Sequence, residues 1–158
     1  MTVAFLTRKH RRATAALGAV SAGLLVLSAC DKPSPVATVT VGSTSVNSEA
    51  ACYDDGKALP EKKLSECLNK PGKSVSVDPS DRVRFGVDPE VAENGWTIFL
   101  NGQNVEPEPF TKTYRSIQAS AFFSNQMGEP SDKTKVTIVE NSGKKVTGIW
   151  SFEFKKKS

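Results

Sequence analysis

Short runs in which apolar and polar residues alternate fill the chain from residue 36 onwards. Many of the apolar residues are β-branched or aromatic, and a period of two is typical of strands that bury one face. Turn residues separate the runs, and Asn101-Gly102 favours a tight hairpin. The predicted strands cover residues 36–41, 44–53, 74–77, 82–87, 96–100, 114–117, 121–123, 135–140 and 146–154. This spacing predicts an all-β domain, which we expect to be an immunoglobulin-like β-sandwich.

Two short helical segments are expected between the strands. Pro60 suits the first position of a helix, and the apolar residues after it fall on one helical face, at Leu64, Cys67 and Leu68. A helical turn is also predicted over residues 88–95, because Asp88 suits the N-cap and Gly95 suits the left-handed position that ends a helix.

The start of the chain has the organisation of an export signal. Residues 1–12 are basic, and residues 13–27 form an apolar stretch shorter than the about 20 residues that span a bilayer. The stretch ends in Leu27-Ser28-Ala29-Cys30, which resembles the lipobox of bacterial lipoprotein signal peptides. That resemblance implies cleavage before Cys30 and attachment of a diacylglyceryl group to its thiol. General secretion is the favoured route, and twin-arginine export, suggested by Arg11-Arg12, is the alternative.

This interpretation divides the chain into a signal peptide (1–29), a lipidated tether (30–35) and a β-sandwich domain (36–158). We expect membrane lipid, bound through Cys30, as one partner. The expected location is the extracytoplasmic face of the cytoplasmic membrane. The tether is short and contains prolines, so the domain is expected to work close to the bilayer.

Cys52 and Cys67 are the two cysteines of the predicted domain. Outside the cytoplasm an even pair most simply forms a disulfide, which here would connect the predicted helix to a strand. The alternative is a redox-active pair, but such pairs are usually close in sequence, as in Cys-x-x-Cys. The sequence therefore predicts a structural Cys52–Cys67 bond.

Charge and composition exclude several classes of function. The net charge of +4 arises from the leader, because removing its four basic residues leaves 17 basic and 17 acidic residues. A neutral domain has no general attraction to nucleic acid. The single histidine, His10, also lies in the leader, which excludes histidine-based catalysis and histidine metal ligation in the domain. No phosphate-binding loop or spaced metal motif is present, so we expect no cofactor and no metal.

Several segments together resemble one family. They are the lipobox and residues 83–90, 95–102, 112–116, 121–124, 148–150 and 152–154. In these segments the chain resembles small actinobacterial secreted lipoproteins that are described only as a domain of unknown function. The resemblance implies a lipid-anchored domain outside the cytoplasm. It implies no activity and no catalytic residue.

Aromatic residues are the main candidates for partner contact. Trp96 and Trp150 lie inside apolar runs, so we expect them in the core, with a sugar-binding platform as the alternative. Tyr114, Phe122 and Phe123 are near a long irregular stretch, and adjacent phenylalanines in a strand cannot both face one core. We therefore name these three residues as candidates for contact with a partner, with burial beneath a loop as the alternative.

The acidic residues Asp88, Glu90 and Glu93, with Asn94, would offer oxygen ligands for calcium, but they lack the spacing of a known calcium loop. We interpret them as helix caps and solvated side chains. The expected function is that of a membrane-anchored, non-enzymatic module that binds an envelope protein or a wall polymer. The alternatives are a histidine-independent hydrolase or transferase and an accessory subunit of a membrane complex.

Overall fold

The computed structural model describes residues 33–124 and 131–157, which are mostly β-strand. The predicted signal peptide and Cys30 lie outside the described residues. The elements in chain order are β1 (Val36–Val41), β2 (Thr44–Glu49), β3 (Cys52–Tyr53), α1 (Glu61–Asn69), β4 (Lys73–Val77), β5 (Arg82–Val87), α2 (Pro89–Asn94), β6 (Trp96–Leu100), β7 (Gln103–Asn104), β8 (Tyr114–Gln118), a 3-10 helix (Ala119–Phe122), β9 (Lys133–Ser142) and β10 (Lys145–Lys156).

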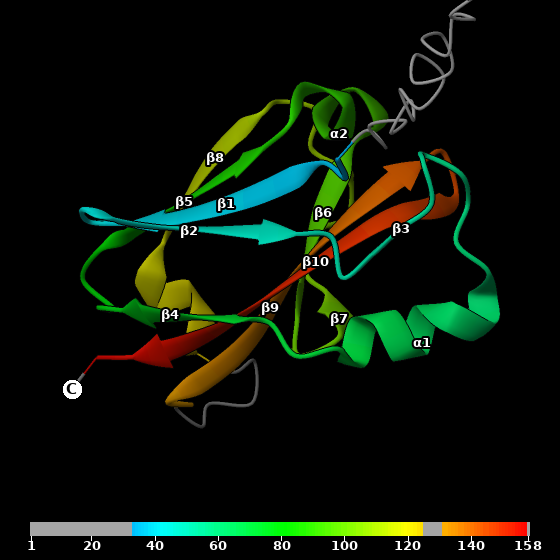
Figure 1. Cartoon of the computed structure of the whole chain (residues 1–158). Coiled ribbons are helices and arrows are strands. Elements are labelled where there is room, and N and C mark those ends of the chain that lie inside the picture. Colours follow the sequence, from blue (N-terminus) through cyan, green and yellow to red (C-terminus); the bar gives the residue numbers. More distant parts are fainter. Residues whose placement is uncertain (1–32, 125–130, 158) are drawn as a thin grey trace, which may run out of the picture. The chain divides into compact units, whose positions relative to one another are not determined.

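Two β-sheets form the two layers of the fold (Figure 1). The first is four-stranded, in the order β2-β1-β5-β8, and all of its neighbouring strands are antiparallel. The second is six-stranded, in the order β3-β10-β9-β6-β7, with β4 also paired to β10. The pairing of β4 with β10 is parallel, whereas β3 pairs antiparallel with an earlier part of the same strand. Two different segments therefore share one edge of β10.

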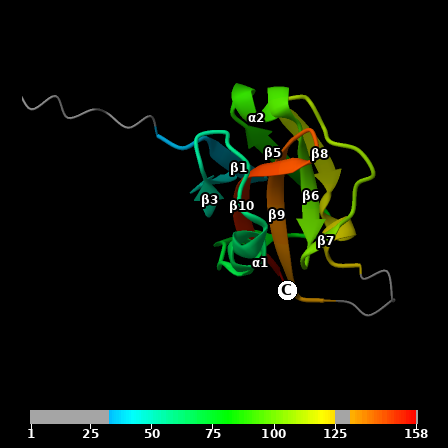
Figure 2. The same ribbon diagram turned by 90° about the vertical axis from the view of Figure 1, so that its right-hand side faces the viewer.

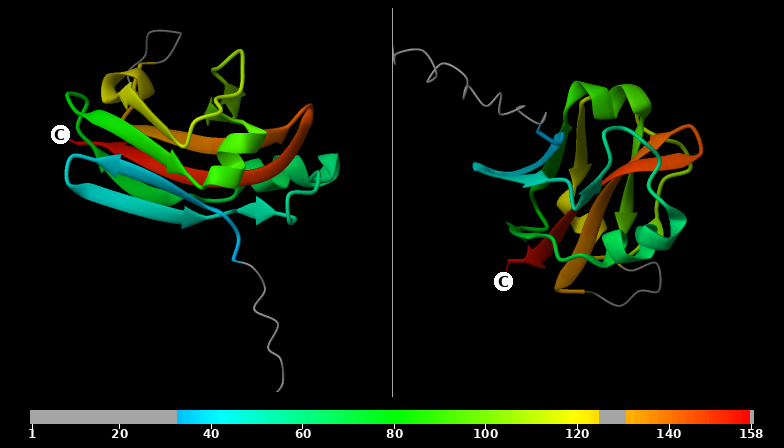
Figure 3. Two further views of the ribbon diagram at one scale, coloured as in Figure 1. Left: turned by 90° about the horizontal axis from the view of Figure 1, so that it is seen from above. Right: turned by 45° about the vertical axis from the view of Figure 1, so that its right-hand side comes forward.

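The core lies between the sheets because each layer turns an apolar face towards the other (Figure 3). In the four-stranded sheet, Val39 and Phe85 are fully buried. Phe154 of β10 stacks on Phe85, with ring centroids 6.2 Å apart, and Phe122 meets Phe154 edge-on at 5.1 Å. Aromatic side chains from both sheets and from the 3-10 helix thus close one continuous cluster.

Most of the predicted strands are confirmed, with boundaries shifted by a few residues. The predicted single strand over residues 44–53 is wrong, because the chain leaves the first sheet after β2 and enters the second as β3. The predicted strand over residues 121–123 is also wrong, because residues 119–122 form a 3-10 helix and Phe123 is its C-cap. Both helices are found where they were expected, and Asp88 and Gly95 take the N-cap and C-cap positions of α2. Among the described residues, no helix is long and apolar enough to span a membrane.

Candidate functional site

The outward surface of the four-stranded sheet carries short polar side chains in cross-strand rows. Strand β1 alternates, so that Val39 faces the core while Thr38 and Thr40 face outward. The strand register extends these two positions into two rows, which are Asn47-Thr38-Gly86-Tyr114 and Ser45-Thr40-Arg84-Ser116. We call these eight residues, with the neighbouring pair Arg82 and Gln118, the polar face.

Tyr114 is the large aromatic side chain of the polar face. It is 54% exposed, and the other exposed large hydrophobic residue of the described chain, Val105, is 42% exposed and lies outside this face. Gly86 stands opposite Tyr114 in the register. A Cβ at Gly86 would lie 3.8 Å from Thr38, an ordinary contact distance. The residue opposite Tyr114 on β5 therefore has no side chain, although its backbone would accommodate one.

The polar face has two arginines and no carboxylate. Arg82 donates from Nε to the hydroxyl of Ser116 at 3.1 Å. Neither Arg82 nor Arg84 has a carboxylate partner within ion-pair distance among the residues that the structure describes. Asp88 accepts a hydrogen bond from the backbone of Val36 at 2.9 Å, at the end of the sheet where β1 begins. The two arginines are thus unpaired, whereas the carboxylates of Glu49 and Asp88 lie in the next row, towards the start of β1.

The residue after Tyr114 points to the other side of β8. Arg115 forms an ion pair with Glu106 and lies over the ring of Phe110, 5.2 Å from its centroid. Glu106 also accepts a hydrogen bond from the backbone of Ile98 at 3.3 Å. These contacts close the gap between the edge of the first sheet and the segment that follows β7. Arg115 therefore serves the structure of this edge, and its charge is not part of the polar face.

A carboxyl group lies in the interior. Glu140 of β9 is fully buried, and its Oε1 accepts a hydrogen bond from Asn94 of α2 at 2.7 Å. Its Oε2 has no hydrogen-bond partner among the described residues. A Cβ at Gly148, opposite Glu140 on β10, would lie 2.8 Å from Oε2 and 2.5 Å from the ring of Trp150. The carboxyl group thus occupies a space that only a glycine on the neighbouring strand leaves open.

Tyr53 of β3 and Glu90 of α2 form a second polar contact. The hydroxyl of Tyr53 donates to Glu90 at 2.7 Å, and its ring lies 6.4 Å from that of Trp150. Burial raises the pKa of Tyr53, and the hydrogen bond to Glu90 and the charges of Glu90 and Glu140 raise it further. In the described ranges, no group of three or more His, Cys, Asp or Glu side chains is arranged to hold a metal ion. The contacts instead attach α2 to the second sheet.

A shallow depression of about 420 Å³ lies between the start of β3 and the start of β4 along β10. It is lined by Ser48, Glu49, Ala51, Pro71, Gly72, Lys73 and Ser151. The hydroxyl of Ser151 is buried without a hydrogen-bond partner among the described residues, and Lys73 donates to the backbone of Asn47 at 2.6 Å. Glu140 does not line this depression, so the interior carboxyl group and the depression do not form one site.

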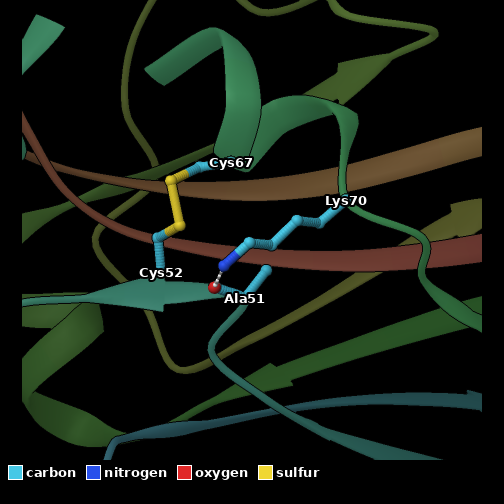
Figure 4. The surroundings of a disulfide bond; sticks show 4 residues. All are labelled: Ala51, Cys52, Cys67 and Lys70. Carbon is cyan, nitrogen blue, oxygen red and sulfur yellow. Dashed lines mark hydrogen bonds between the residues drawn. A yellow bond between two sulfur atoms is a disulfide. The ribbon is translucent and has the colours of Figure 1, made fainter. Parts of the chain in front are cut away.

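The predicted disulfide is confirmed. Cys52 and Cys67 are bonded, with their Cα atoms 5.8 Å apart, and Cys67 is 2% exposed. Figure 4 shows a second attachment beside it, in which Lys70 donates from Nζ to the backbone of Ala51 at 2.8 Å. Lys135 of β9 donates to the backbone oxygens of Leu68 and Lys70 at the end of α1. The helix is thus held to the second sheet at one face (Figure 2).

The domain is attached firmly at the point where the predicted tether ends. Pro35 is buried, and its backbone oxygen accepts a hydrogen bond from the indole of Trp150 at 2.8 Å. The next backbone nitrogen, that of Val36, donates to Asp88. These contacts fix Pro35 and Val36 to the domain, five and six residues after Cys30 in the sequence.

The three candidates for partner contact differ in their exposure to solvent. Tyr114 is exposed, whereas Phe122 and Phe123 are 4% and 5% exposed. Burial of both phenylalanines is possible because the segment is a 3-10 helix and does not alternate like a strand. Phe122 and Phe123 therefore have a packing role, and the predicted contact with a partner rests on Tyr114. Trp96 and Trp150 are fully buried in the core, as expected.

Sequence reasoning missed Arg84 and Glu140. Arg84 was recognisable as an outward position in the alternation of 82–87, but its row on the sheet depends on pairing with β1 and β8. Glu140 follows Val136 and Ile138 at a spacing of two, which is the pattern of an inward position. That pattern was a usable signal for a buried carboxyl group.

No family model, no curated protein and no solved structure matches the chain.

Proposed function

We propose that this protein is a lipid-anchored, extracytoplasmic binding module that contacts a component of the cell envelope through its polar face. The single observation that carries the proposal is Tyr114, a largely exposed aromatic residue opposite a glycine on a sheet of short polar side chains. Exposed aromatic residues are typical of binding surfaces, because they bury much area at a small cost in conformational entropy.

The proposed anchor is consistent with how the domain begins. The lipobox-like segment before Cys30 supports acylation, and the resemblance to actinobacterial lipoproteins supports the same location. Because Pro35 is held by Trp150, the chain from Cys30 to the domain extends over about 17 Å at most. A module on so short a tether reaches ligands close to the bilayer. The immunoglobulin-like assignment of the two layered sheets is part of the same proposal.

The enzymatic alternative needs a carboxylate or lysine that a substrate can reach beside a hydroxyl or a second carboxylate. Glu140 has no exposed surface. The depression brings Glu49 and Lys73 near Ser48 and Ser151. Among the described residues, however, neither serine hydroxyl is hydrogen-bonded to the side chain of Lys73 or Glu49, and Lys73 donates to the backbone of Asn47. The accessory-subunit alternative needs a broad apolar face, whereas the exposed large hydrophobic residues of the described chain are Val105 and Tyr114. These observations favour the binding module.

The test is retention by purified envelopes from the bacterium that produces the protein. We expect Tyr114→Ala to lower the apparent affinity of the full-length protein for the envelopes by about tenfold, which is the loss typical of a central contact residue. Val105→Ala is the matched control, because it removes the other exposed large hydrophobic side chain. Equal retention of the two variants and the wild type would contradict the proposal.

A further inference from the structure

We infer that the ligand of the polar face is an anionic glycan of the cell envelope. In this assignment Tyr114 stacks on a sugar ring, and Arg82 and Arg84 bind acidic groups of the same polymer. The inference rests on the proposed function, because it names the ligand class of the proposed contact surface.

The shallow shape of the polar face favours a sugar polymer over a protein as its ligand. Its outward side chains other than Tyr114, the two arginines and Gln118 are threonine, serine, asparagine and glycine, which give a shallow surface. A stable protein contact usually centres on several large side chains that fill pockets. One exposed aromatic residue opposite a glycine instead fits a flat ligand with one apolar side, which is the shape of a sugar ring.

The hydroxyl and amide groups of the face are prepared for a ligand rich in hydroxyl groups. Thr38 donates to Asn47 at 2.9 Å, and Thr40 and Ser45 form a hydrogen bond at 2.5 Å. These cross-strand bonds hold the four side chains in fixed positions. Each hydroxyl oxygen keeps acceptor capacity, and the amide nitrogen of Asn47 keeps its donors.

The two arginines indicate that the ligand carries negative charge. Arg82 and Arg84 project from the same side of β5 two residues apart, so an extended polymer lying along that strand passes both guanidinium groups. Guanidinium groups bind carboxylate and phosphate in a bidentate manner. Because neither arginine has a carboxylate partner within ion-pair distance among the described residues, their charge is available to an anionic ligand.

The experiment measures sedimentation of the full-length protein, solubilised in detergent, with detergent-extracted cell walls of the producing bacterium. One sample of walls is left intact, a second is digested with protease, and in a third the acidic groups are removed or neutralised by phosphodiester hydrolysis and carbodiimide amidation. The charge variant is the double substitution Arg82→Gln/Arg84→Gln. Lys62→Gln/Lys63→Gln removes two exposed charges from α1 and is the matched control.

We expect binding to survive protease, to fall at least about tenfold on neutralised walls, and to fall similarly in the arginine variant but not in the lysine control. Loss after protease digestion would show a protein ligand and overturn the inference. Equal binding of intact and neutralised walls, or of wild type and the arginine variant, would also overturn it. If Tyr114→Ala still loses envelope retention in those cases, the proposed function stands without this ligand class. If Tyr114→Ala also leaves envelope retention unchanged, both the anionic-glycan ligand and the proposed function are contradicted.

Discussion

Gly148 has no side chain, and this permits Glu140 and Trp150 to pack against its backbone. Its position opposite Glu140 follows a register shift in the pairing of β9 and β10, and a Cβ there would collide with the ring of Trp150. We predict that Gly148→Ala lowers the free energy of unfolding by about 1–3 kcal/mol, as overpacking of a core does. Chemical denaturation measures this difference.

Gly86→Ala is the matched control for that substitution. Its Cβ would meet no atom closer than 3.8 Å, so its free energy of unfolding should stay within about 0.5 kcal/mol of the wild type. A similar loss in both variants would mean that the cost is general to glycines in strands and does not come from the contact with Trp150.

Tyr53 makes the stability depend on pH in the alkaline range. Its pKa in the folded protein is raised above the ordinary value of 10.0 by burial and by Glu90. The unfolded chain therefore releases the proton first, and the stabilisation that is complete below pH about 10 is lost as the pH rises above it. We predict a steeper loss of unfolding free energy between about pH 9.5 and 11 in the wild type than in Tyr53→Phe. Equal slopes would refute this role of Tyr53.

Individual side-chain environments were predictable where alternation sets them. Trp96 and Trp150 could be placed in the core because they stand in apolar runs. The pair Phe122 and Phe123 could not, because a 3-10 helix of four residues leaves no periodic signal in so short a segment. The contact of Tyr53 with Glu90 joins residues 37 apart in sequence and depends on the packing of α2, which local pattern does not determine.

Helix α1 depends on the disulfide for much of its attachment. The bond closes a loop with a sequence separation of 15 residues, and the chain-entropy relation assigns about 3 kcal/mol to a loop of this size. We predict that Cys52→Ala/Cys67→Ala lowers the free energy of unfolding by about this amount, measured by urea denaturation. An unchanged value would mean that the Lys70 and Lys135 hydrogen bonds suffice.

Strand positions and the partners of adjacent strands in hairpins could be predicted, whereas the pairing of strands distant in sequence could not. The hairpin of β9 and β10 follows from two adjacent alternating runs with a glycine turn at Gly143. The parallel pairing of β4 with β10 joins segments separated by most of the domain, and no local signal specifies it. The same limit applies to the polar face, whose rows exist only because β1 pairs with both β2 and β5.

The molecule as a whole carries the proposed ligand surface on the four-stranded sheet, beside the strand that begins after Pro35. Thr38, Gly86 and Tyr114 stand one row away from the row of Val36, and Arg84 and Arg82 follow further along β5. In the proposed function, the lipid anchor concentrates this face at the membrane surface. This arrangement predicts that removing the anchor weakens capture of the ligand in cells without changing the affinity of the face.

Photocrosslinking in living cells tests this account most directly. A benzoylphenylalanine residue replaces Tyr114 in one protein and Val105 in another, each with Cys30 and with Cys30→Ala. We expect a crosslinked envelope product from position 114 that needs Cys30 for full yield, and little or no product from position 105. A product of equal yield from both positions, or none from position 114, would contradict the claim that the polar face is the binding surface of an anchored module.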